Sequence, residues 1–275
     1  MQTALPHQRA LAYRTAGRGH GGITRLVSPG DLGHVMKPFV FVDLFELAPG
    51  RPEMGLHPHS GIATVTVVMQ GAVRYRETNG HHGVLRKDSV EWMAAGGGVW
   101  HGGGIEGDQT VRGVQLWLAL PPEDENSPAQ SRYLAPHEVP QTGPARVIIG
   151  SYGGAASPLR PRASINYLHV RLRDGELWDY QPPPGHNVAW VALSQGVLHT
   201  AGAILRREVG VFEDGCGALT FRAEGETEFV LGSAPRHPHD LYMGSYSVHT
   251  SEDALQRGEE EIRRIGMQLQ RDGLL

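Results

Sequence analysis

Residues 55–71, GLHPHSGIATVTVVMQG, indicate the fold class of this chain. Two histidines, His57 and His59, stand directly ahead of the alternating and β-branched run ATVTVVMQ. Alternation with a period of two is typical of a β-strand with one buried face. Residues two apart on a strand point to the same face, so we expect the two imidazoles to lie side by side. Pro58 between them removes a ladder donor, which favours a strand start or edge.

The same β pattern continues through most of the chain. AVRYRE follows Gly71, the pair Asn79-Gly80 is a hairpin signal, and VRGVQLWLALP reads as another apolar strand. A stretch rich in proline and acidic residues comes next, and strands resume at ARVIIGSYGG. The 37 glycines and 19 prolines suit short strands joined by many turns. These features predict an all-β protein.

An internal repeat predicts two copies of one β unit. Residues 67–74, VVMQGAVR, resemble residues 191–199, VALSQGVLH, with Gln70-Gly71 aligned on Gln195-Gly196. Residues 83–92, GVLRKDSVEW, resemble residues 203–212, AILRREVGVF. We expect two tandem β-barrels or sandwiches: an N-terminal domain at 1–122, a connector with the first strand of the second half at 123–160, and a C-terminal domain at 161–275.

Only the C-terminus is predicted to be helical. In residues 250–273 the apolar side chains recur at three- and four-residue steps: Leu255, Ile262, Ile265 and Leu269. Thr250 or Ser251 can cap the start, and Gly273 suits the end. We expect this helix to lay its apolar stripe on the β body.

The repeat also provides a control for the histidines. A third histidine, His101, ends the glycine-rich run EWMAAGGGVWHGGG. Carried onto the second copy, the three histidines fall on residues that bind no metal: Pro182, Pro184 and Phe221. The fold unit therefore does not require the histidines, and we expect one functional pocket, in the first half. Neutral imidazole is the commonest side-chain ligand for iron, zinc, copper or nickel.

Three stretches together resemble the N-terminal half of the pirin family, which are bicupins: KPFVFVDLFE, residues 55–101 and VQLWLALP. The resemblance implies two cupin β-barrels of the jelly-roll type. It also implies a metal, usually iron, held in the N-terminal barrel by three histidines and a glutamate. Members include quercetin 2,3-dioxygenases, which cleave a flavonol ring with O₂, and a nuclear transcriptional co-regulator. The family pattern carries the three metal-ligating histidines onto His57, His59 and His101.

The fourth ligand of the family does not carry over. Its position, two residues after the third histidine, is Gly103, and the acidic position of general cupins is Ala63. A neutral site should bind a divalent cation more weakly, so Gly103→Glu is expected to raise metal affinity. Glu106, three residues further along, could swing in as a substitute. The expected cofactor is iron, with zinc, nickel, copper or manganese as alternatives, or no metal at all.

Three functional hypotheses follow. The first is a pirin-like metal-binding cupin with dioxygenase activity on a flavonol-like or other small enolisable substrate; the missing glutamate at Gly103 counts against efficient activity. The second is a non-catalytic pirin-like protein with a weakened or lost metal site, acting through binding or regulation. A cupin isomerase or small-molecule binder with zinc or nickel is a third. The pattern identifies no catalytic residue.

Composition limits the classes of binding partner that we expect. The net charge of −4, from 25 basic and 29 acidic residues, offers no basic surface for nucleic acid. No run approaches the ~20 apolar residues of a membrane span. A small-molecule ligand is expected, and a protein partner under the second hypothesis. The single cysteine, Cys216, and the lack of a signal-like N-terminus favour the cytoplasm.

For the other histidines and for one tryptophan we expect mainly structural roles. His81 and His82 follow the Asn79-Gly80 signal and are expected in an exposed turn. His237 and His239 repeat the His-Pro-His string, but they lie in a predicted loop without a third histidine. Trp100, next to His101, could be a core residue or a platform for substrate.

Overall fold

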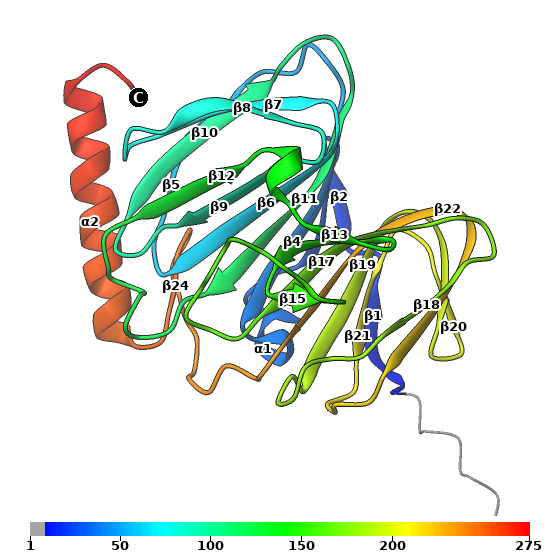
Figure 1. Ribbon diagram of the computed structural model, residues 1–275. Coiled ribbons are helices and arrows are strands. Elements are labelled where there is room, and N and C mark those ends of the chain that lie inside the picture. Colours follow the sequence, from blue (N-terminus) through cyan, green and yellow to red (C-terminus); the bar gives the residue numbers. More distant parts are fainter. Residues whose placement is uncertain (1–8) are drawn as a thin grey trace, which may run out of the picture. The chain divides into compact units, whose positions relative to one another are not determined.

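The computed structural model describes residues 9–275, and most of them lie in β-strands (Figure 1). The chain divides into two compact units. The histidine unit consists of Gly19–Glu138 and His237–Leu275, and the second unit consists of Val139–Arg236 with the described residues up to Arg18. These ranges differ from the linear domains expected from the sequence, because each end of the chain joins the half that is distant in sequence. No helix in the described part of the chain is long and apolar enough to cross a bilayer.

The histidine unit contains two antiparallel sheets. The first has seven strands in the order β12 (Gln130–Leu134), β9 (Val90–Ala94), β6 (Ile62–Gln70), β11 (Val111–Ala119), β4 (Phe39–Leu47), β3 (Ile23–Val27) and β2 (Arg18–His20). The second has four strands in the order β5 (Met54–His59), β10 (Val99–Ile105), β7 (Ala72–Glu77) and β8 (His82–Arg86). The shorter elements are α1 (Gly33–Met36), η1 (Pro136–Glu138), β23 (Tyr242–Met243) and β24 (Val248–His249).

The two sheets of the histidine unit face each other across an interior that contains polar groups. Tyr75 on β7 stacks on Tyr133 of β12, with ring centroids 3.8 Å apart. His59 on β5 meets Trp117 of β11 edge-on at 4.8 Å. Strand β6 lies between β9 and β11 and is buried from Ile62 to Met69, so both of its faces are covered rather than the one face that the alternation predicted.

The second unit is built on one nine-stranded sheet. Its main path runs β1 (Leu11–Thr15), β21 (Val209–Phe212), β19 (Val188–Thr200), β22 (Leu219–Ala234), β17 (Asn166–Leu172), β14 (Ala145–Ile149) and β13 (Gln141–Thr142), with β18 (Leu177–Tyr180) on β22 and β20 (Ala203–Leu205) on β19. The strands β15 (Ser151–Tyr152) and β16 (Ala155–Ala156) pair separately. An apolar core rich in aromatic rings fills this unit, including Trp178, Phe212, Phe221 and Phe229.

Strand pairing matches the internal repeat. In the hairpin that Asn79-Gly80 predicted, Val73 of β7 pairs with Leu85 of β8. In the second unit Leu198 of β19 pairs with Leu205 of β20. Val73 and Leu198 lie 125 residues apart, which is also the spacing between Gln70 and Gln195 in the first pair of similar segments. Leu85 and Leu205 lie 120 residues apart, which is the spacing between the second pair of similar segments. The repeat seen in the sequence is therefore a structural repeat.

The predicted C-terminal helix is present as α2 (Glu252–Arg271), but it belongs to the histidine unit. Ser251 caps it by accepting a hydrogen bond from the Ala254 amide. Figure 1 shows α2 running beside β5 and β10. Its buried stripe includes two glycines, Gly258 and Gly266, that the apolar periodicity did not reveal.

The predicted connector is more ordered than its proline-rich composition suggested. Residues 130–134 form β12, which pairs with β9 at the edge of the seven-stranded sheet. Ser131 and Tyr133 on this strand point inward, where both donate hydrogen bonds to the buried carboxylate of Glu77. The flanking prolines concealed a strand that helps to build the interior of the histidine unit.

Candidate metal centre

The structure brings together the three histidines singled out from the sequence. His57 and His59 lie at the end of β5, and His101 lies on β10, directly opposite His57 in the antiparallel ladder. One ring nitrogen from each residue lies within 4.8 Å of the others. The ring centroids of His57 and His101 are 4.4 Å apart, and those of His59 and His101 are 5.0 Å apart. The group could hold a divalent metal ion.

Hydrogen bonding identifies the free ring nitrogen in two of the three histidines, His57 and His59. His57 Nδ1 lies 3.1 Å from the carbonyl of Gly55, and His59 Nδ1 lies 3.0 Å from that of Tyr246. A carbonyl can only accept, so these Nδ1 atoms carry the protons and leave Nε2 with a lone pair. The Nε2 atoms of His59 and His101 are buried without a hydrogen-bond partner among the described residues. Buried imidazole lone pairs that converge without donors fit a cation.

The protonation state also suits a metal. Burial, reinforced by the neighbouring His101, lowers the pKa of His57 to about 4. The same two causes hold the pKa of His59 well below its usual range. Both rings are therefore neutral at physiological pH, and neutral imidazole is the form that coordinates a metal.

The backbone explains why position 103 carries no carboxylate. A Cβ atom added to Gly103 would lie 2.0 Å from the carbonyl oxygen of Arg74, on the neighbouring strand β7. The ladder between β10 and β5 is also irregular between His101 and Gly103. No side chain fits here without displacing backbone, which argues against the expectation that Gly103→Glu would raise metal affinity.

The other two carboxylate positions considered from the sequence also lie elsewhere. Thr64 pairs with Trp117, so these two side chains share the face of the sheet on which Trp117 contacts His59. Ala63 is the adjacent residue along the strand. Because side chains alternate along a strand, Ala63 points to the opposite face of the sheet. Glu106 accepts a hydrogen bond of 2.7 Å from Arg74 at a partly exposed position and is not in the histidine group.

Three residues that the sequence did not identify surround the histidines. Tyr246 comes from the segment between β23 and β24, and its carbonyl orients His59. Trp117 packs against His59 from the opposite sheet. Glu91 on β9 places Oε1 3.8 Å from His101 Nδ1. Glu91 is a polar residue inside an apolar strand, which is a weak signal; the position of Tyr246 depends on chain packing and has no local signature.

Trp100 does not face the histidines. Its indole Nε1 donates a hydrogen bond of 2.8 Å to the carbonyl of Ile262 in α2. A Cβ on Gly266 would come within 2.7 Å of the same indole, so the glycine allows the helix to approach closely. Trp100 therefore anchors α2 rather than contacting a substrate at the histidines.

The remaining histidine candidates form no comparable group. His81 and His82 are exposed beside the β7–β8 turn, as expected. His237 and His239 lie in the loop before β23, with ring centroids 5.4 Å apart. Within residues 9–275 the only cluster with metal-ligand spacing is that of His57, His59 and His101.

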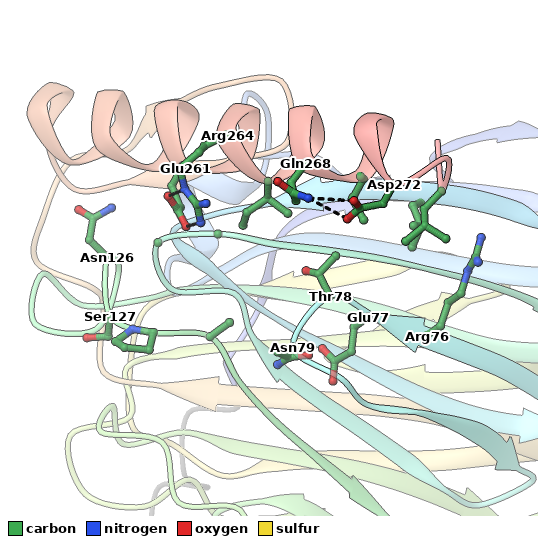
Figure 2. Close-up of a pocket in the computed structure, with 18 residues that line it drawn as sticks. Arg76, Glu77, Thr78, Asn79, Asn126, Ser127, Glu261, Arg264, Gln268 and Asp272 are labelled. Carbon is green, nitrogen blue, oxygen red and sulfur yellow. Dashed lines mark hydrogen bonds and ion pairs between the residues drawn. The ribbon is translucent and has the colours of Figure 1, made fainter.

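A cavity of about 920 Å³ lies between α2 and the β body of the histidine unit (Figure 2). Figure 2 shows Gln268 and Asp272 on the helix, with Glu77 and Asn79 across from them. None of the three histidines lines this cavity. It is a separate feature from the candidate metal centre.

Comparison with known proteins agrees with this architecture. Residues 23–118, which include all three histidines, match the family model described as Pirin. A pirin-like protein of Caulobacter vibrioides is 27% identical over 258 residues, which cover 88% of this chain and 88% of that protein.

Solved structures share the fold. A crystal structure of quercetin 2,3-dioxygenase from Acinetobacter baumannii superposes with a TM-score of 0.85 at 22% identity, covering 94% of this chain and 97% of that one. A bacterial pirin, YhhW from Escherichia coli in complex with nickel(II), gives a TM-score of 0.64 at 16% identity, covering 85% of this chain and all of that one. The all-β, cupin-type fold with a C-terminal helix is confirmed, and the part of the chain that contains the three histidines is similar to the pirin family.

Proposed function

We propose that the histidine unit binds a divalent metal through Nε2 of His57, His59 and His101, and that the protein uses it as an oxygenase. The observation that carries this proposal is the convergence of the three imidazoles with their Nδ1 atoms directed elsewhere. Iron is the expected metal from the resemblance, and the nickel in the YhhW structure is consistent with a site that accepts late divalent ions. The proposed substrate is a flavonol-like or other small enolisable molecule.

This chain's own residues would contribute orientation and exclusion of water. The carbonyls of Gly55 and Tyr246 fix two imidazole tautomers, so no rearrangement is needed when a metal binds. Trp117 covers one side of His59. A metal bound here would supply Lewis-acid or redox chemistry to the oxygen atoms of a substrate. With three protein ligands, coordination positions remain for such a molecule.

Metal content tests the binding step. The wild-type protein and the double variant His57→Ala/His59→Ala are purified after iron-replete expression, and metals are measured by elemental analysis. We expect close to one metal per chain in the wild type and almost none in the double variant. The matched control is His237→Ala/His239→Ala, which changes the other His-Pro-His string and should retain the metal. A metal-free wild type would contradict the proposal.

Turnover tests the oxygenase step separately. Metal-loaded protein is mixed with quercetin under anaerobic conditions, and the visible absorbance of the flavonol is followed after oxygen is admitted. Loss of absorbance that requires both oxygen and the intact histidines supports the proposal. If metal is bound and quercetin persists, flavonols are not the substrate class.

A non-catalytic role is the second candidate. It is favoured by position 103, where the backbone of Arg74 excludes the carboxylate found in the family pattern. In this case a small ligand or a protein partner would be bound without turnover. Metal binding with no oxygen consumption across a panel of enolisable compounds would support this second candidate over the first.

A further inference from the structure

Glu91 is a buried carboxylate directed at the candidate metal centre from the opposite sheet. It lies on β9, where it pairs with Thr66 of β6 and Tyr133 of β12, and only 5% of its surface is exposed. The Thr66 hydroxyl donates a hydrogen bond to Oε2. The other oxygen, Oε1, faces Nδ1 of His101 at 3.8 Å, which is beyond direct hydrogen-bond distance.

The geometry completes a pattern around the three imidazoles. Nδ1 of His57 faces a carbonyl, Nδ1 of His59 faces a carbonyl, and Nδ1 of His101 faces the Glu91 carboxylate. Each ring thus has a protein oxygen near its Nδ1 atom. Only the oxygen near His101 belongs to a charged group. In metal sites, a carboxylate behind a ligating histidine orients the ring and makes it a stronger ligand.

We propose that Glu91 is a positioning residue that supplies, from behind His101, the negative charge that this chain lacks among its direct ligands. This inference rests on the proposed function, because it assumes a cation at the Nε2 atoms. The negative charge of Glu91 near Nδ1 favours the tautomer of His101 that carries its proton there, and this charge offsets that of the cation through the imidazole. Thr66 fixes the carboxylate so that Oε1 faces the histidine.

The burial of Glu91 supports a specific role. A carboxylate inside a protein is costly unless charged or hydrogen-bonding partners compensate it. Thr66 provides one hydrogen bond, and at 3.8 Å the His101 ring is too far from Oε1 to provide a second one. A metal ion at Nε2 would add a nearby positive charge, which further stabilises the carboxylate.

Glu77 provides a matched control. It is also a buried carboxylate in the histidine unit and lies opposite His101 in the β7–β10 ladder, but its oxygens accept hydrogen bonds from Ser131 and Tyr133. Glu91→Gln and Glu77→Gln therefore remove the same charge from the same interior, but only Glu91 faces Nδ1 of a candidate ligand. Any effect of burial alone should be similar in the two variants.

The test uses Co²⁺ as the probe, with full-length protein. Affinity is measured by competition against a chromophoric chelator, and the ligand field is read from the cobalt d–d absorption. Glu91→Gln should weaken Co²⁺ binding about 10–100-fold and shift the d–d bands, as expected for loss of an outer-shell carboxylate. Glu77→Gln should leave both properties unchanged. Equal affinity and an unshifted spectrum in Glu91→Gln would overturn the inference.

Two further arms keep the inference testable. If Glu91→Gln does not fold, Thr66→Val removes the hydroxyl that orients the carboxylate and should weaken Co²⁺ binding several-fold; unchanged affinity would then count against the inference. If the wild type itself binds no Co²⁺, the proposed function fails. If the wild type binds and Glu91→Gln binds equally well, the inference fails and the proposed function stands.

Discussion

Replacing Gly103 by alanine should destabilise the histidine unit, although the change adds only one methyl group. The added Cβ would lie 2.0 Å from the carbonyl oxygen of Arg74 and 3.2 Å from the Cα of Tyr75. Ordinary van der Waals contact needs at least 3.4 Å. Strands β7 and β10 would have to separate by more than an ångström where they are hydrogen-bonded, and the obstacle is backbone that cannot rotate away.

The magnitude follows from the cost of overpacking. Forcing an extra methyl into a well-packed region costs about 1–3 kcal/mol, and we expect the upper end because the clash involves backbone. For a chain of this size that corresponds to a fall of roughly 5–10 °C in Tm. Gly103→Glu should be at least as destabilising, and it should not improve metal binding.

The assay is thermal and urea unfolding of the metal-free variants, followed by circular dichroism. Gly55→Ala is the matched control, because it lies on β5 in the same sheet and its added Cβ would have no neighbour within 4 Å. The control should be neutral or slightly stabilising. A Gly103→Ala protein that unfolds together with Gly55→Ala would refute the argument that the backbone excludes a side chain at this position.

Three other outcomes are expected. Glu106→Gln should leave Co²⁺ affinity unchanged, because Glu106 pairs with Arg74; a tenfold loss would place it at the metal. The metal-free protein should lose stability as pH falls from about 6.5 to about 4, because His57 takes up a proton in the unfolded chain but not in the folded chain. Its folded-state pKa of about 4, against 6.5 in the unfolded chain, corresponds to a loss of at most about 3 kcal/mol in the free energy of unfolding. Urea unfolding at pH 7, 5.5 and 4.5 measures this, and a flat profile would contradict it. Trp100→Phe should lose the hydrogen bond to Ile262 and cost about 1 kcal/mol in urea unfolding, with metal content retained; loss of metal would show that Trp100 also supports the histidines.

The comparison of the two repeats explains how far sequence reasoning reached. The equivalents of the histidines in the second unit include Phe221, which is fully buried in that unit's aromatic core. The same β scaffold thus carries the histidines in one copy and, at the position of His101, a packed aromatic ring in the other. This is the arrangement expected when the histidines are not needed for folding.

The sequence did not predict which unit holds the C-terminal helix. The chain was expected to hold α2 in its C-terminal half, because sequence order was the only guide. The helix instead docks through Trp100, and Gly258 and Gly266 in its buried face allow close approach. Small residues at a close helix–strand contact leave no apolar periodicity for the sequence to display.

The sequence by itself determined the all-β class, the internal repeat, the C-terminal helix and the three histidines. Each of these depends on local periodicity or on short-range spacing, which the order of residues records directly. Only the tertiary structure decided that Gly103 excludes a side chain and that Glu91 and Tyr246 approach the histidines. Those facts arise from strands far apart in the chain that meet across a sheet or an interior, and their distances depend on packing that no local pattern encodes.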